Sequence, residues 1–200
     1  MDFLKFFDRA LRARKTAYGR RSDMSESALG LYRAAVAAAR APGFYARHGV
    51  PDTPDGRFDM IALHVFLALR RLKREPGPAR SDAQALAQAL TDLMFADMDR
   101  NLREMGVGDL GVGKQVKALA AAFRGRVVAY DAALERTDGD GGLAEALGRN
   151  LFRGPGQTAG KGVAMLAMYV RAADGLLASL PWSTLAAGKA VFPPPPDALD

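Results

Sequence analysis

The sequence contains no cysteine and only two histidines, His48 and His64. The lack of thiols excludes a disulfide framework, a thiolate zinc site and a cysteine nucleophile. Serines are few, and no histidine has sequence neighbours that suggest a nucleophilic triad. His64 lies within an apolar segment, where a hydrogen-bonded core histidine is more common than a metal ligand or a base. We therefore predict no catalytic, cofactor-binding or metal-binding residue and no enzymatic activity.

Long apolar runs are also missing. The longest charge-free apolar stretch in the middle of the chain is Met60–Leu69, which is far shorter than the ~20 residues that span a bilayer. A second run, Gly162–Val170, ends at Arg171. We therefore expect the chain not to cross a membrane. The helix predicted over Val163–Leu180 is apolar on most sides, so we expect it to be central in the fold.

Signals for β-strands are weak throughout the chain. Sustained alternation is absent and β-branched clusters are few, whereas Ala, Leu, Arg and Met are abundant. The prediction is an all-α protein with one compact bundle-like domain at 22–181 and an extended Pro-rich tail at 182–200 that has no reason to pack. Six helices are predicted from capping residues or three- and four-residue apolar steps: they begin near Asp23, Asp59 and Ser81 or cover Val116–Leu134, Leu143–Leu151 and Val163–Leu180.

Positive charge is concentrated in a basic arm, residues 1–21. This segment carries seven basic and two acidic residues, an excess of +5 out of the net +6. The remainder is nearly neutral, unlike a domain that binds DNA along a basic face. Apolar residues share one helical stripe with basic residues beside it, as in interfacial helices. Membrane contact is predicted for Phe3, Lys5, Phe6, Phe7, Arg9 and Arg12. The alternatives are a helix docked on its own domain, a partner contact and a disordered arm.

Two further patterns look like chemistry but have structural explanations. Gly106–Gln115 matches both a dinucleotide fingerprint and a Walker loop by spacing, except that Gln115 replaces the magnesium-binding hydroxyl residue. Both motifs require a preceding strand, and here the preceding residues end a predicted helix. We therefore predict a helix–loop–helix connection.

Three aspartates on the preceding predicted helix could suggest a metal site. Helical metal sites use Glu-x-x-His pairs, and none exists here. Ion pairs with Arg100 and Arg103 are therefore the expected use of Asp92, Asp97 and Asp99.

Two blocks of the sequence, Phe44–Leu72 and Leu86–Tyr130, resemble the ubiquinol–cytochrome c chaperone family. Together they cover about half of the chain, in the family's order. The most specific pieces are the runs VPDT at 50–53, RFD at 57–59 leading to LH at 63–64, and DMD at 97–99 leading through LREMGVGD at 102–109. The resemblance implies an all-α chaperone that binds newly made cytochrome b and helps it reach the bc1 complex. It implies no nucleotide hydrolysis.

The resemblance also implies possible partners and a location. Mitochondrial relatives act with a small partner protein near the ribosomal exit, so the ribosome is a candidate partner here. The length and the Ala/Arg/Gly-rich composition resemble a bacterial member of the family. We therefore expect the protein in the cytoplasm, peripheral at the anionic inner face of the inner membrane. No small-molecule substrate is expected.

Polar residues within the resembling blocks are the predicted partner-binding surface: Asp52, Thr53, Arg57, Asp97, Arg103, Glu104 and Asp109. An equal alternative is that Asp52, Asp59 or Asp109 serves as a helix cap. Two other functions stay open. One is a peripheral helical binding module that contacts ribosomal RNA or anionic membrane through the basic arm. The other is a small helical enzyme with a lipid or quinone substrate.

Overall fold

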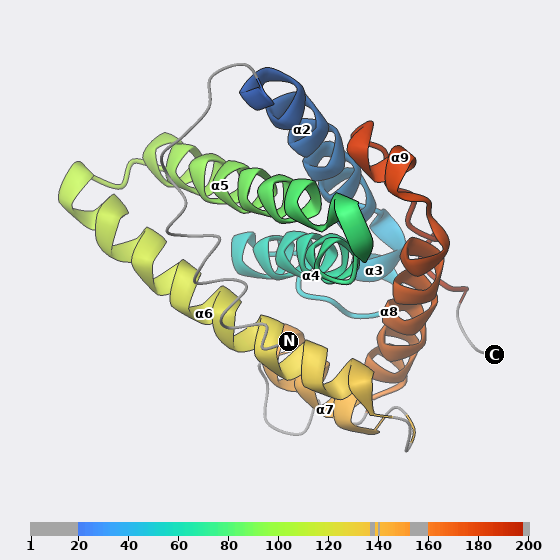
Figure 1. The fold of residues 1–200 in the computed structure, drawn as a ribbon. Coiled ribbons are helices and arrows are strands. Elements are labelled where there is room, and N and C mark those ends of the chain that lie inside the picture. Colours follow the sequence, from blue (N-terminus) through green and yellow to red (C-terminus); the bar gives the residue numbers. More distant parts are fainter. Residues whose placement is uncertain (1–19, 137–138, 140, 153–159, 198–200) are drawn as a thin grey trace.

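The part of the chain that the structure describes contains ten helical segments (Figure 1). The structure is a computed structural model, and it describes residues 20–136, 139, 141–152 and 160–197. Over these residues the fold is all-α, as predicted, and contains no strand. The segments are α2 (Arg20–Ala39), α3 (Pro42–Ala46), α4 (Pro54–Lys73), the short 3-10 helix η1 (Gly77–Ala79), α5 (Arg80–Glu104), α6 (Asp109–Glu135), α7 (Gly141–Leu147), the π-helix η2 (Gly148–Phe152), α8 (Lys161–Ser179) and α9 (Trp182–Ala186).

Helix α4 lies at the centre of the domain. Fourteen of its 20 residues are buried, and it packs against α2, α5, α8 and η2. The prediction that the helix near Val163–Leu180 is central was therefore wrong. Helix α8 buries one side against α4 and α7, while Met168 on its other side is 53% exposed. Apolar composition did not separate the two helices, because α8 exposes mainly alanine and glycine rather than charged residues.

Helix α8 is also the one described helix that is long and apolar enough to span a membrane by length and composition. The relevant window is 44% buried inside the domain. Val163, Leu166, Val170 and Leu177 are among its buried residues. Core helices of soluble proteins meet the same two criteria, so this observation is weak evidence for a membrane span.

Several helices begin earlier than predicted. Helix α4 starts at Pro54, and Thr53 is its N-cap because the Thr53 hydroxyl accepts a hydrogen bond from the Gly56 amide at 3.1 Å. Asp59, the predicted start, lies inside the helix and is buried. Helix α5 starts at Arg80 without a side-chain cap, so the predicted capping role of Ser81 was wrong. Apolar periodicity locates the buried turns of a helix, whereas the polar first turn escapes it.

The connection between α5 and α6 is a helix–loop–helix joint, which confirms the prediction for Gly106–Gln115. Gly106 has φ +84°, a left-handed conformation that favours glycine. The Gly106 amide donates to Arg103 O at 3.0 Å and the Val107 amide to Leu102 O at 3.1 Å. This pair of bonds is a Schellman motif, which ends a helix. Gly108 is the N-cap of α6, so the glycines of this segment terminate and begin helices.

The C-terminal tail packs on the domain, and the expectation that it has no reason to pack was wrong. It begins with α9 and continues without regular structure through residues 187–197. The ring of Phe192 lies edge-on to His64, with 5.1 Å between the ring centroids. His48 Nε2 donates to Pro196 O at 2.8 Å. Proline carbonyls accept hydrogen bonds, and an aromatic side chain gains from burial, so a Pro-rich segment can be bound tightly without secondary structure.

Candidate functional site

An open pocket of about 530 Å³ lies beside α3, and we call it the α3 pocket. Its lining comes from the residue that follows α2, from α3, from the loop after α3 and from the first turn of α4. The lining residues are Arg40, Pro42, Tyr45, Ala46, Val50, Asp52 and Arg57. The loop and the first turn of α4 therefore bring two of the predicted partner-binding residues, Asp52 and Arg57, into one concave surface.

Asp52 and Arg57 form an exposed ion pair at the rim of the α3 pocket. Arg57 Nε donates to Asp52 Oδ1 at 2.6 Å. This hydrogen bond lowers the pKa of Asp52 and raises the pKa of Arg57, so both groups are charged at neutral pH. Burial raises the pKa of Tyr45, and the positive charges of Arg57 and Arg40 oppose this rise. The Tyr45 hydroxyl donates to Ala39 O at 2.7 Å, which fixes α3 against the end of α2.

Two other predicted contact residues have packing roles in the structure. Thr53 caps α4, as described above. Asp97 accepts a hydrogen bond from the Tyr32 hydroxyl at 2.8 Å, which links α5 to α2. Burial and this hydrogen bond raise the pKa of Tyr32, so its hydroxyl stays protonated and acts as the donor. Whether Thr53 and Asp97 also contact a partner stays a prediction.

The remaining predicted contact residues lie at the joint between α5 and α6. Arg103 Nε pairs with Asp99 at 2.7 Å, and the same guanidinium pairs with Asp109 at the start of α6. Glu104 is exposed. Figure 1 shows this joint at the opposite end of α5 from α3. The predicted partner-binding residues therefore form two separate surfaces rather than one.

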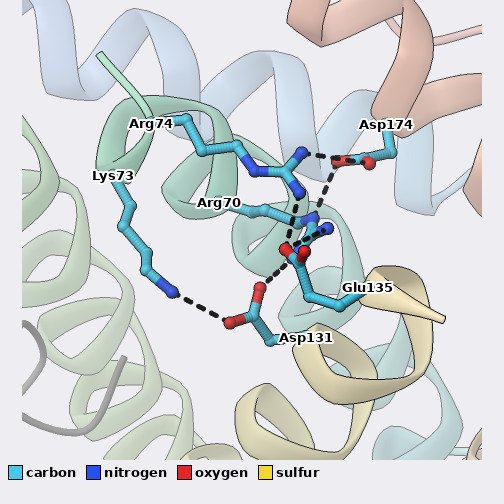
Figure 2. A network of polar contacts seen from close by, with 6 residues as sticks. All are labelled: Arg70, Lys73, Arg74, Asp131, Glu135 and Asp174. Carbon is cyan, nitrogen blue, oxygen red and sulfur yellow. Dashed lines mark hydrogen bonds and ion pairs between the residues drawn. The ribbon is translucent and has the colours of Figure 1, made fainter. Parts of the chain in front are cut away.

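The sequence analysis missed a charged cluster at the end of α4 (Figure 2). Arg70 is 1% exposed and reaches carboxylates on two other helices: Asp174 of α8 at 3.1 Å, Glu135 of α6 at 3.0 Å, and Asp131 of α6. Lys73 pairs with Asp131 at 2.9 Å and Arg74 with Glu135 at 2.8 Å. The hydrogen bond from Arg74, with Arg70 nearby, lowers the pKa of Glu135. Three cations and three carboxylates thus hold α6 and α8 against α4.

Some sequence signals for this cluster existed. Asp131 and Glu135 are four residues apart and so share a helix face, and Asp174 is the one carboxylate within α8. Arg70 directly follows the apolar residues Leu67–Leu69. These signals do not reveal that the residues meet, because the pairs are about 60 and 100 positions apart in the chain. The three cations balance the three carboxylates, so the cluster joins three helices without leaving a buried cation unpaired.

His64 is a buried and fully hydrogen-bonded histidine, as predicted. Its Nδ1 donates to Met60 O at 2.8 Å, and the Tyr169 hydroxyl donates to Nε2 at 2.7 Å. These partners assign the neutral tautomer. Burial lowers the pKa of His64 to about 4, so the ring is uncharged at neutral pH. His64 thus links α4 to α8 and, through Phe192, to the tail.

The described residues contain no candidate metal cluster, and they do not include the residues predicted to contact a membrane. Within residues 20–136, 139, 141–152 and 160–197, no group of three or more His, Asp or Glu side chains is placed to hold a metal ion. The residues predicted to contact the membrane, Phe3, Lys5, Phe6, Phe7, Arg9 and Arg12, lie outside the described residues.

The fold and the sites together define a class of protein: an all-α domain in which buried hydrogen bonds and ion pairs join the helices, with an open pocket on its surface. Comparison with known proteins adds the family. The model of the ubiquinol–cytochrome c chaperone family matches residues 46–192, which is most of the chain. The chain belongs to this family.

Relatives of known name and structure agree with this assignment. The crystal structure of the Cbp3 homolog from Brucella abortus superposes with a TM-score of 0.74 and 42% identity, covering 86% of this chain and 93% of that one. Ubiquinol–cytochrome c reductase complex assembly factor 1 is 28% identical in Mus musculus and 29% in Homo sapiens, each over 63% of this chain. The chain spans about two fifths of the length of these two relatives, 41% and 40%.

Proposed function

We propose that this protein promotes assembly of the cytochrome bc1 complex by binding newly synthesised cytochrome b until the complex forms. The observation that carries the proposal is the family match over residues 46–192. The relatives are named as assembly factors for ubiquinol–cytochrome c reductase, and the proposed mode of action is binding of the client. The ribosome, as a site of cytochrome b synthesis, is a further proposed partner.

The α3 pocket and the α5–α6 joint are the proposed contact surfaces. The joint lies within the matched residues, and so do Ala46, Val50, Asp52 and Arg57 of the pocket, whereas Arg40, Pro42 and Tyr45 precede the matched range. Both carry exposed charged side chains next to apolar ones, such as Met105, which is 60% exposed at the joint. Surfaces of this mixed character suit a protein that must bind and then release its client.

The proposed location is the cytoplasmic face of the inner membrane, where cytochrome b is inserted. The support is the basic arm, residues 1–21, with its excess of +5. Each basic residue near an anionic membrane surface contributes ~1 kcal/mol of attraction. A peripheral position would bring the chaperone to a client that is entering the bilayer.

The test is a crosslinking pull-down from cells that produce the tagged protein, with bound proteins identified by mass spectrometry. Cells expressing the tag alone are the control, and bc1 content is measured in cells that lack the protein. We expect enrichment of cytochrome b and a loss of assembled bc1. Normal bc1 content without the protein would overturn the assembly role. A loss of bc1 with no crosslink to cytochrome b would keep the assembly role and overturn the proposed client.

A further inference from the structure

We propose that the α3 pocket binds an acidic peptide segment of the protein partner. In this arrangement Arg40 and Arg57 hold a carboxylate, and the apolar wall of the pocket holds a neighbouring side chain. The proposal rests on the proposed function only in taking the ligand to be part of another protein. Four features of the pocket support it: its charge, its apolar wall, its size and its rigidity.

The charged groups of the pocket leave guanidinium donors available. Arg57 uses only Nε for Asp52, so its two terminal amino groups are open to a ligand. Arg40 is exposed and forms no ion pair with any residue that the structure describes. With two arginines and one aspartate the lining has a net charge of +1. Arginine forks bind planar carboxylates through paired hydrogen bonds, and this geometry favours an anionic ligand.

The uncharged part of the lining distinguishes a peptide from a simple anion. Pro42, Tyr45 and Ala46 supply accessible apolar surface beside the two arginines, whereas Val50 is only 2% exposed. The volume of about 530 Å³ lies within the range of roughly 300–1,000 Å³ that is usual for ligand pockets. A phosphate ion would fill a small part of this space and make no use of the apolar wall. A glutamate or aspartate with an apolar neighbour would use both parts.

The walls of the pocket are held in place before any ligand binds. The Tyr45 hydroxyl binds Ala39 O, and the Val50 amide donates to Phe44 O at 3.1 Å. A Cβ atom at Gly56 would overlap Pro51 O, so the loop backbone lies directly against the first turn of α4. Preformed walls reduce the entropy that is lost on binding, which favours recognition of a short segment.

The experiment titrates the full-length, isotope-labelled protein by NMR with three blocked tripeptides, acetyl-X-Glu-X-amide with X as Leu, Val or Phe. Each peptide has a twin with Gln in place of Glu, and inorganic phosphate is titrated in parallel. We expect at least one Glu peptide to bind at least about tenfold more tightly than its Gln twin. The shifted amides should belong to residues around Arg40, Tyr45 and Asp52–Arg57.

Two charge-reversal variants locate the binding. Arg40→Glu should weaken the Glu peptide at least about tenfold, because the carboxylate would then meet a like charge. Arg33→Glu is the matched control, since Arg33 is exposed on the same face of α2 two turns earlier and does not line the pocket. It should bind as the unmodified protein does. Thermal unfolding of both variants confirms that they are folded.

Three results would overturn the proposal. The first is equal binding of the Glu and Gln peptides in all three pairs, including no binding of either. The second is an equal loss of Glu-peptide affinity in Arg33→Glu and Arg40→Glu. The third is phosphate binding as tightly as the Glu peptides, which would indicate a plain anion site. The measurement uses purified protein and no bc1 readout. Its failure is therefore distinct from failure of the assembly role, which is tested by the bc1 content of cells.

Discussion

Arg70 shows how a single residue can join three helices. Its guanidinium is buried at the end of α4 and contacts Asp131 and Glu135 of α6 and Asp174 of α8. A buried cation is costly to desolvate, and only the surrounding carboxylates offset that cost. The ion pairs therefore depend on one another, and removal of the central cation leaves the three carboxylates with only Lys73 and Arg74 as partners.

Replacement Arg70→Met should lower the free energy of unfolding by about 3 kcal/mol, because the methionine keeps the side-chain stem but not the charge. The measurement is urea unfolding followed by circular dichroism. Arg74→Met is the matched control: Arg74 is 41% exposed and pairs with the same Glu135 and Asp174, so it should cost less than about 1 kcal/mol. Equal losses in the two variants would contradict a central role for Arg70.

His64 should make the protein less stable at acidic pH. Burial lowers its folded-state pKa from 6.5 to about 4, so between these values the unfolded chain takes up a proton that the folded protein does not. Stability is therefore fully present above pH 6.5, falls with decreasing pH, and stops falling from this cause below about 4. A loss of about 1.4 kcal/mol per pH unit gives about 3 kcal/mol in all.

The test compares urea unfolding of the protein and of His64→Gln between pH 7.5 and 4. The other titrating groups are common to both proteins and cancel in the difference. The unmodified protein should lose about 3 kcal/mol more than the variant over this range. Parallel pH curves would show that His64 does not titrate as its buried position requires.

At the scale of elements, two adjacent residues at the start of α4 have different expected roles: Thr53 in folding and Asp52 in binding. Thr53→Ala removes the N-cap and should lower the free energy of unfolding by about 1 kcal/mol. Asp52→Ala removes an exposed ion pair next to it and should leave the unfolding free energy unchanged. Urea unfolding of the two variants distinguishes these outcomes. A stabilising role for Asp52 equal to that of Thr53 would favour the alternative in which Asp52 is the cap.

The tail is an element without regular structure whose packing can be measured. Phe192→Ala should lower the free energy of unfolding by about 1–2 kcal/mol, since the ring is partly buried against His64 and the core. Val191→Ala, at the adjacent and 54% exposed position, should change it by less than about 0.5 kcal/mol. Thermal or urea unfolding gives both values. Identical values would show that the tail does not contribute through Phe192.

At the scale of the whole molecule, charge is distributed unevenly. Deletion of residues 2–19 removes five basic and two acidic residues and should reduce binding to vesicles of anionic lipid at least about tenfold. Vesicles of neutral lipid are the control, because they lack the attraction. Replacement of Phe3, Phe6 and Phe7 by alanine tests the apolar stripe separately. Unchanged flotation with anionic vesicles after the deletion would give the basic arm another function.

Much of the architecture follows from local sequence patterns. Apolar steps of three and four residues located the long helices, and Gly106 marked the end of α5 because few other residues adopt its left-handed backbone. The all-α fold, the joint at Gly106–Gln115 and the hydrogen-bonded core position of His64 could all be predicted this way. The family could be predicted as well, since its most specific runs are contiguous in the chain.

Tertiary structure alone decided which helix is central and which charged residues meet. Helices α4 and α8 are both apolar, and only their neighbours determine that α4 is covered on all sides. The cluster around Arg70 combines residues that are distant in sequence, and the α3 pocket places Arg40, which no sequence pattern singled out, beside the predicted residues Asp52 and Arg57. The tail was predicted not to pack because its prolines favour an extended segment, yet it is bound through Phe192 and Pro196. The physical reason is the same in each case: periodicity and capping act over one or two helical turns, whereas burial and ion pairing depend on which surfaces the folded chain brings together.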